Sequence, residues 1–219
     1  AGLRYNYQIL NASDTKLADE VGVARALVGS VILDLNHDKR DNVLFPRQGY
    51  RLNGNVETAS DYLGGEVNFE RLEMSASYHQ PVSKISWLHF GLSHGVIFTQ
   101  GSPADELPFN KRFFPGGANS VRGYQEGEAA PRNARGDVIG AATYALLSVE
   151  FEQALTEEWS AVLFSDSIGF AENTSNYPFD EELYSVGLGI RWKTVIGPVR
   201  LEYGYNLNPR PDDPVGTLQ

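Results

Sequence analysis

Residues 111–127, KRFFPGGANSVRGYQEG, hold the densest set of groups suited to specific chemistry in this chain. Gly116 and Gly117 can take positive φ angles, and Pro115 fixes the direction of the chain before them. Arg122 carries a guanidinium group with five donors that stays charged in proteins. The segment is typical of a shaped loop that presents polar groups, and a long surface loop with a chance Gly-Gly pair is the alternative.

Motifs of enzymes and cofactor sites find little support. The histidines are scattered and lack the H-E-x-x-H spacing of zinc proteases; they are His37, His79, His89 and His94. The chain has no G-x-S-x-G motif, and its Gly-rich loop lacks the G-K-[ST] ending of phosphate-binding loops. A barrel enzyme with a Ser and a His in its wall stays open. We predict no catalytic residue, no metal site and no cofactor.

The composition points to a sheet-rich protein. The chain has 219 residues with 11 Tyr, 11 Phe, 3 Trp and 22 Gly, which favours an all-β fold. The absence of cysteine excludes disulfides and thiolate metal sites. A net charge of -10 argues against a nucleic-acid surface. No apolar run approaches 18 residues, but a mean hydropathy of -0.31 is compatible with a transmembrane barrel, whose strands alternate polar and apolar residues.

A period of two in hydrophobicity runs through the chain and predicts nine antiparallel strands and the start of a tenth. We expect them at residues 3–10, 22–34, 50–59, 69–79, 85–98, 144–153, 160–169, 183–193, 198–207 and from 216 onward. Short turns alternate with longer loops, as in outer-membrane barrels, although the connector at 36–49 is long for a turn.

The last long strands show two distinct faces. One face is apolar and ends in Tyr or Trp; it includes Val186, Leu188, Ile190, Leu201, Tyr203 and Tyr205. The opposite face carries Arg191 and Glu202. This pattern predicts a lipid-facing band with aromatic girdles around a water-filled lumen. A soluble β-sandwich with one face on a core is the alternative.

Four motifs resemble the outer-membrane protein assembly-factor superfamily, the bacterial surface antigen domain, which includes BamA, TamA and the two-partner secretion transporters. Residues 112–124, RFFPGGANSVRGY, match its lumenal loop with the Val-Arg-Gly-Tyr/Phe signature. Residues 38–49, DKRDNVLFPRQG, match its D-x-R-D-N-x-x-x-P-x-x-G connector. Residues 164–169, FSDSIG, and 187–198, GLGIRWKTVIGP, resemble its last two motifs. Residues 131–141, PRNARGDVIGA, look closer to TamA than to BamA.

The resemblance implies that residues 1–219 are the C-terminal part of an outer-membrane β-barrel, about the last nine to ten of sixteen strands. The signature loop, at about residues 100–140, would fold into the lumen. The POTRA domains and the first strands would be absent from this chain. On this basis we expect these residues to form an open, curved sheet or an incomplete barrel wall.

The family's function implies a non-enzymatic assembly, insertion or translocation factor of the bacterial outer membrane. Its partners would be unfolded outer-membrane proteins and the lipid bilayer, with accessory subunits or an inner-membrane partner reached through POTRA domains, and no nucleic acid. The mechanism would use a weakly closed seam between the first and last strands and the inward-folded loop. A passive porin-like channel and an outer-membrane lipid hydrolase are the alternatives.

The resemblance also carries a set of site residues. They are the loop signature Gly116, Gly117, Val121, Arg122, Gly123 and Tyr124, the lumenal partners Phe164 and Asp166, and the wall motif Gly187, Gly189 and Arg191. Arg122 would pair with Asp166, an acid on an otherwise apolar strand, and a solvated Arg in a mobile loop is the alternative.

Departures from the family pattern affect two of these motifs. Val195 stands where the family has proline, and Gly169 falls one place late in FSDSIG, which puts the geometry there in doubt.

Arg191 and Glu202 face the lumen by parity, and we expect them to be wall charges without a specific task.

Overall fold

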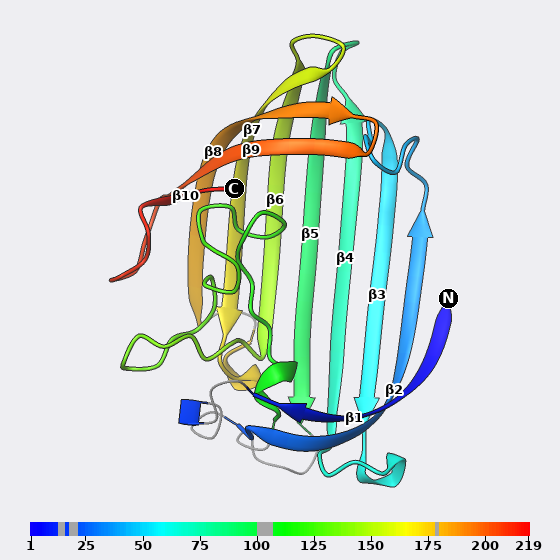
Figure 1. Cartoon of the computed structure of the whole chain (residues 1–219), viewed down its shortest axis with the longest axis vertical. Coiled ribbons are helices and arrows are strands. Elements are labelled where there is room, and N and C mark those ends of the chain that lie inside the picture. The colour runs from blue at the N-terminus through cyan, green and yellow to red at the C-terminus, as the bar shows by residue number, and fades with distance from the viewer. Residues whose placement is uncertain (13–15, 18–21, 100–106, 178–179) are drawn as a thin grey trace.

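The computed structural model describes residues 1–12, 16–17, 22–99, 107–177 and 180–219. Within them, ten strands form one antiparallel sheet in which each strand pairs with the next along the chain (Figure 1). They are β1 (Gly2–Asn11), β2 (Arg25–Asp38), β3 (Gly49–Ala59), β4 (Phe69–Pro81), β5 (Ser86–Thr99), β6 (Thr143–Ala154), β7 (Trp159–Ala171), β8 (Glu181–Thr194), β9 (Gly197–Asn206) and β10 (Gly216–Leu218).

Helical structure is slight by comparison. The short helices η1 (Asp61–Leu63), η3 (Phe109–Lys111) and η4 (Thr174–Asn176) have three residues each. None of the helices in the described ranges is long and apolar enough to cross a membrane. The all-β prediction is therefore confirmed.

The predicted strands are present, with ends that differ by a few residues. The largest difference is in β2, which runs to Asp38 instead of ending at residue 34. The strand continues because β3 keeps pairing with it, as far as the pair Asp38 and Arg51. The connector that looked too long for a turn therefore shrinks to residues 39–48. Residues 100–106 of the expected lumenal loop lie outside the described ranges.

The sheet curls into a trough with two free edges. β8 and β9 arch across one end of the view in Figure 1, and β1 and β2 curve across the other. Among the described residues, β1 pairs with β2 alone and β10 pairs with β9 alone. The sheet is thus open, and the concave side of the trough is called the lumen below.

Connectors alternate between the two ends of the trough because all strand pairs are antiparallel. The turn end carries residues 39–48, 82–85, 155–158 and 195–196, and the loop end carries residues 60–68, 207–215 and the long connection that includes 107–142. Each lumenal side chain is therefore placed by its strand and by its distance from one of these two ends.

The convex face is apolar. On β8 and β9 the side chains predicted to face lipid are all exposed: Val186, Leu188, Ile190, Leu201, Tyr203 and Tyr205. Near the turn end, Trp159 and Trp192 stack with their ring centroids 5.7 Å apart. A continuous apolar outer face with aromatic side chains near its border is typical of a transmembrane barrel wall.

The lumen at the loop end is packed and does not hold the expected water-filled space. Residues 107–142 fold back over the inner faces of β6, β7 and β8 (Figure 1). Phe113, Val121 and Tyr124 of this segment join one buried apolar cluster with Ile168 and Phe170 of β7. The prediction of a watery lumen is wrong here, because the inner face of β7 is apolar on both sides of Asp166 and the loop covers it.

A charge placed on the outer face tests this orientation. Leu201 is 51% exposed in the middle of β9, and Leu201→Arg is expected to lower the free energy of unfolding by about 2–4 kcal/mol in a bilayer. Ile196→Arg is the matched control, because Ile196 lies in the β8–β9 turn and should change it by about 0–1 kcal/mol. Urea titration of the protein in lipid vesicles measures both. Equal effects would contradict the assigned lipid-facing surface.

Candidate functional site

The lumenal loop has a defined shape of its own. Its two ends pair as a short bridge, in which Phe113 and Ala141 exchange backbone hydrogen bonds of 2.9 and 2.8 Å. Gly116 and Gly117 have φ angles of 130° and 85°, a region that favours glycine. Gly117 donates to the carbonyl of Tyr124 at 3.0 Å, which closes the tip into a compact turn. The tip is thus a built structure.

Arg122 is held against β7 by Asp166. Its Nε and Nη2 donate to the two carboxylate oxygens of Asp166 at 2.9 and 2.8 Å, and its backbone N–H donates to Oδ2 at 3.1 Å. The Asp166 side chain is fully buried, and Ser148 of β6 also donates to it at 2.6 Å. The guanidinium carbon lies 3.5 Å from the centre of the Phe164 ring. The expected contact between Arg122 and Asp166 is therefore present in the structure.

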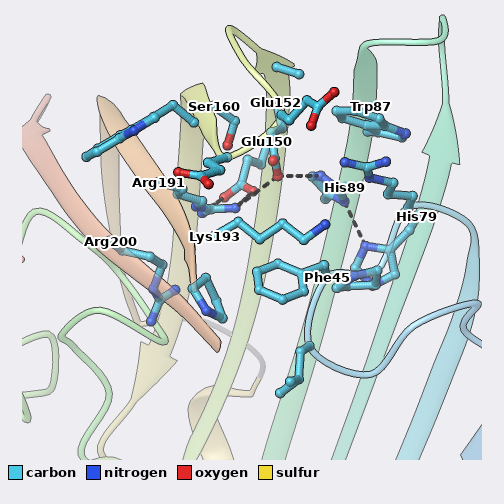
Figure 2. Close-up of a pocket in the computed structure, with 18 of the residues that line it drawn as sticks. Phe45, His79, Trp87, His89, Glu150, Glu152, Ser160, Arg191, Lys193 and Arg200 are labelled. Atoms are coloured by element: carbon cyan, nitrogen blue, oxygen red, sulfur yellow. Dashed lines mark hydrogen bonds and ion pairs between the residues drawn. The ribbon is translucent and has the colours of Figure 1, made fainter. Parts of the chain in front are cut away.

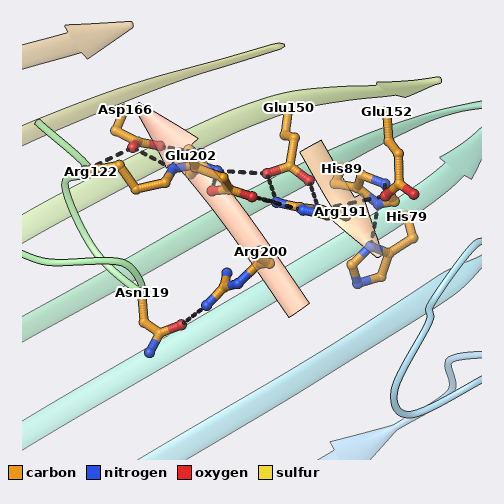
Figure 3. Close-up of polar contacts among 11 residues, drawn as sticks. His79, His89, Asn119, Arg122, Glu150, Glu152, Asp166, Arg191, Arg200 and Glu202 are labelled. Carbon is orange, nitrogen blue, oxygen red and sulfur yellow. Dashed lines mark hydrogen bonds and ion pairs between the residues drawn. The ribbon is translucent and has the colours of Figure 1, made fainter. Parts of the chain in front are cut away.

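Two further carboxylates meet the same guanidinium. Nη1 of Arg122 donates to Glu150 of β6 at 2.7 Å and to Glu202 of β9 at 3.1 Å. Arg191 of β8 bridges both acids from the other side, at 2.5 and 2.7 Å to Glu150 and at 2.6 and 2.8 Å to Glu202 (Figure 3). The expectation that Arg191 and Glu202 have no specific task is wrong, because both belong to this network.

The charged groups of this network lie in a buried part of the lumen. Arg122, Glu150, Asp166 and Glu202 are all buried, and three carboxylates face two guanidinium groups. Burial alone would lower the pKa of Arg122, but its hydrogen bonds and charge interactions with Asp166 and Glu150 raise that pKa above its ordinary value. The arginine therefore stays charged, and its position against β6, β7 and β9 is fixed by bidentate and charge-assisted hydrogen bonds.

The loop backbone lies directly on the wall. A side-chain carbon on Gly204 of β9 would come within 2.3 Å of the Arg122 carbonyl oxygen, and one on Gly123 would overlap Asn206. Asn206 is buried and donates from Nδ2 to the Gly123 carbonyl at 2.8 Å. Gly187 and Gly189 of β8 leave room for Phe164 and Glu202 in the same way. Glycine on both surfaces permits this contact between backbones.

The loop also contacts the last strand. Thr217 of β10 donates to the carbonyl of Gly123 at 2.9 Å, and Gln219 donates to that of Tyr124 at 2.9 Å. Val121 and Tyr124 are fully buried in the apolar cluster. The signature Val-Arg-Gly-Tyr is therefore fixed by side chains or carbonyls at each of its four residues.

Residues 5–219 match the Omp85 superfamily domain. The chain belongs to the Omp85 superfamily. It is 27% identical to the outer membrane protein assembly factor BamA of Neisseria meningitidis over 83% of this chain and 27% of that protein. It is 29% identical to BamA of Nitratidesulfovibrio vulgaris over 78% of this chain and 22% of that protein. The chain thus spans about a quarter of the length of these relatives.

Other relatives and a solved structure agree with this assignment. Over 49% of its length the chain is 29% identical to a mouse homologue of sorting and assembly machinery component 50, covering 22% of that protein. The crystal structure of BamA from Haemophilus ducreyi lacking POTRA domains 1-3 superimposes with a TM-score of 0.74 at 18% identity, over 89% of this chain and 41% of that one. The fold is therefore a partial Omp85-type barrel, integral to the outer membrane.

At the turn end, the connector 39–48 of the Omp85 chain lies beside the inner face of the wall. Asp41 Oδ1 accepts the backbone N–H groups of Asn42, Arg47 and Gln48 at 2.9, 2.9 and 3.1 Å. Partial burial acts to raise the pKa of Asp41, but these hydrogen bonds lower it below its ordinary value. The Arg47 guanidinium lies 4.3 Å from the centre of the Trp87 ring, so the folded connector packs against β5.

A cavity of about 410 Å³ lies between this connector and the wall (Figure 2). Its lining includes His79, His89, Glu150, Glu152 and Arg191. The Arg191 guanidinium thus separates the packed half of the lumen from the hollow half. Figure 3 shows the polar contacts running from Asp166 through Arg122 and Arg191 to the two histidines.

The main residues that sequence reasoning missed are Ser148, Glu150 and Asn206, and it gave Glu202 no role. Their parity placed Ser148 and Glu150 on the polar face of β6, and Glu202 and Asn206 on that of β9. Parity alone does not reveal the partner of a side chain, because this depends on the register between strands and on where the loop lies. A polar residue opposite a glycine on the next strand, as Glu202 is opposite Gly189, was the available signal.

Removing one charge of the central pair tests its strength. Arg122→Ala leaves Asp166 buried without its cation and is expected to cost about 3–5 kcal/mol of stability. The double variant with Asp166→Ala should be little less stable than either single variant, because the partners are coupled. Arg4→Ala is the control, since its pair with Asp34 is exposed and should contribute about 0–1 kcal/mol. Denaturant unfolding compares wild type, the two single variants, the double variant and the control; strictly additive losses would show that the pair is not coupled.

Asn206→Leu tests the contact between the wall and the loop backbone. The change removes the donor for the carbonyls of Gly123 and Pro214, so we expect a loss of about 1–3 kcal/mol. Asn36→Leu is the matched control, because its hydrogen bond to Asn53 is exposed, and its effect should stay within about 0.5 kcal/mol. Limited proteolysis of residues 111–127 should accelerate only in Asn206→Leu, and unchanged cleavage would contradict the role of Asn206.

Proposed function

We propose that this chain is the C-terminal part of the sixteen-stranded barrel of an outer-membrane protein assembly factor. Membership of the Omp85 superfamily over residues 5–219 supports the proposal, as do the names of the BamA relatives. The superimposed BamA structure from Haemophilus ducreyi is longer than this chain, which covers 41% of it. We propose that the remaining strands and POTRA domains belong to the full-length protein.

The proposed substrates are unfolded outer-membrane proteins, taken up at a seam between the first and last barrel strands. A strand with unpaired N–H and C=O groups can template an incoming strand by backbone hydrogen bonding. β10 contributes such an edge, since it pairs with β9 alone among the described strands. Accessory subunits, or an inner-membrane partner, would act through the POTRA domains. No nucleotide, cofactor or catalytic group takes part in this mechanism.

The lumenal loop is the proposed support of that edge, and its network with the wall is the observation that carries the proposal. Arg122 joins the loop to β6, β7 and β9, while Gly123 accepts a hydrogen bond from Thr217 of β10 and Tyr124 accepts one from Gln219, the next residue after β10. A loop so anchored can set the position of the last strand relative to the wall. The loop also fills the lumen at its own end, which disfavours a passive channel.

Reconstitution of the full-length protein tests this function. In lipid vesicles it should accelerate folding of an added, urea-unfolded outer-membrane barrel protein, measured as the heat-modifiable band on gels. Arg122→Ala should insert normally but lower that rate several-fold, because the loop loses its anchor, and Arg4→Ala should keep the wild-type rate.

The alternatives give different results in the same vesicles. Ion conductance without accelerated folding would indicate a porin-like channel, and release of fatty acids from the lipid would indicate a hydrolase. Folding rates equal to those of empty vesicles would contradict the proposal.

A further inference from the structure

A row of metal-ligand side chains crosses three neighbouring strands at the turn end of the lumen. His79 of β4 is the register partner of His89 of β5, and His89 is the partner of Glu150 of β6. Glu152 lies two residues further along β6, on the same face. All four line the cavity behind the connector 39–48 (Figure 2). Strand pairing alone thus brings two imidazoles and two carboxylates together, although they are far apart in sequence.

The two imidazoles fix each other. Their Nδ1 atoms are 2.7 Å apart, so one ring donates a hydrogen bond to the other. Nε2 of His89 is buried and lacks a hydrogen-bond partner, although it lies 3.3 Å from a carboxylate oxygen of Glu152. Nε2 of His79, a residue only 9% exposed, is likewise buried without a partner. If His79 is the donor, neutral His89 carries its proton on Nε2, which then points to Glu152. If His89 donates through Nδ1 instead, the lone pair on its Nε2 faces that carboxylate, and a cation between them makes this contact favourable.

The charges around the cluster also leave room for a cation. Along the chain of contacts in Figure 3, Asp166, Glu150, Glu202 and Glu152 provide four carboxylates against the guanidinium groups of Arg122 and Arg191. The nearby Lys193 lines the same cavity with its ammonium 5.3 Å from the centre of the Phe45 ring. Within this network the carboxylates outnumber the guanidinium groups by two, and Arg47, Lys193 and Arg200 also line the cavity.

We propose that His89, Glu150 and Glu152 bind a divalent transition-metal cation, with Zn²⁺ the best match. One ligand atom from each lies within 4.8 Å of the others, and small side-chain rotations would bring them to the roughly 2.0–2.2 Å that Zn²⁺ requires. One nitrogen and two oxygen ligands suit zinc, and the cavity supplies space for a water as fourth ligand. His79 would accept a hydrogen bond from Nδ1–H of His89 and so fix the orientation of that ring, a role that a carboxylate, a backbone carbonyl or water usually has behind a metal-bound histidine.

The site would share an acid with the loop network. Glu150 keeps its contacts with Arg122 and Arg191 while a remaining lone pair faces the metal. The cation would then tie β5 to β6 at the turn end, independently of any role in protein assembly. Because Arg191 donates to Glu150 and also lies 3.5 Å from Glu152, its charge should weaken binding relative to a site without arginine.

Metal titration of the full-length protein, purified without a polyhistidine tag, tests the site. Isothermal titration with Zn²⁺ should show one saturable event, and Co²⁺ should give the visible absorption of a four-coordinate site. His89→Ala should abolish both signals, and His79→Ala should weaken Zn²⁺ binding by about 10–100-fold. His37→Ala is the matched control, since His37 is exposed at the end of β2 beside Tyr50 and should leave binding unchanged.

Each variant is first checked for the heat-modifiable mobility of a folded barrel, so loss of binding cannot reflect unfolding. Glu152→Gln gives a second test that conserves shape, and it should also lower affinity. Binding that is equal in wild type and His89→Ala would overturn the site. So would the absence of saturable binding.

Discussion

The guanidinium group of Arg122 is the interaction on which the arrangement of the lumen depends. It sits in a buried position where an unpaired charge would be costly, so the loop that carries it is stable only when carboxylates are in place. Those carboxylates come from three strands, β6, β7 and β9, and all three contact the same guanidinium group. Docking of the loop therefore requires the wall strands to hold their register, and the docked loop holds that register in return.

The contact between backbones makes this interaction selective for one geometry. Gly204 and Gly123 allow the loop to approach β9 until Asn206 reaches the Gly123 carbonyl. Any side chain at either glycine would lift the loop and lengthen the bonds between Arg122 and Asp166. The glycines and the charges thus act together. The glycines permit the loop to approach the wall, and the ion pairs make any other loop position unfavourable. A buried ion pair contributes little net stability, because desolvation of its charges offsets their attraction. It therefore stabilises the fold only when its groups lie in a favourable geometry.

Much of this fold could be predicted from the sequence, because alternation is a local property. The faces of β8 and β9, the positions of the turns and the inward loop all follow from residue types along one strand or from recognised motifs. The partners of Arg122 beyond Asp166 did not follow, since Glu150 and Glu202 are 28 and 80 residues from it in sequence. The lumen was expected to be watery for the same reason: the apolar inner face of β7 was read along its own strand, without the loop that covers it.

The two halves of the lumen differ in how the charged side chains are packed and paired, and Arg191 lies at the boundary between them. Toward the loop end, packing excludes water and every acid in contact with Arg122 has a guanidinium partner. Toward the turn end, the cavity leaves space beside Glu150 and Glu152, and the Nε2 atoms of His79 and His89 make no hydrogen bond. A change of charge at the turn end acts on Glu150 directly, and Glu150 shares its carboxylate between Arg191 and Arg122. The signature loop is thus connected electrostatically to the turn end of the barrel wall through Glu150 and Glu202, which both bridge Arg122 and Arg191.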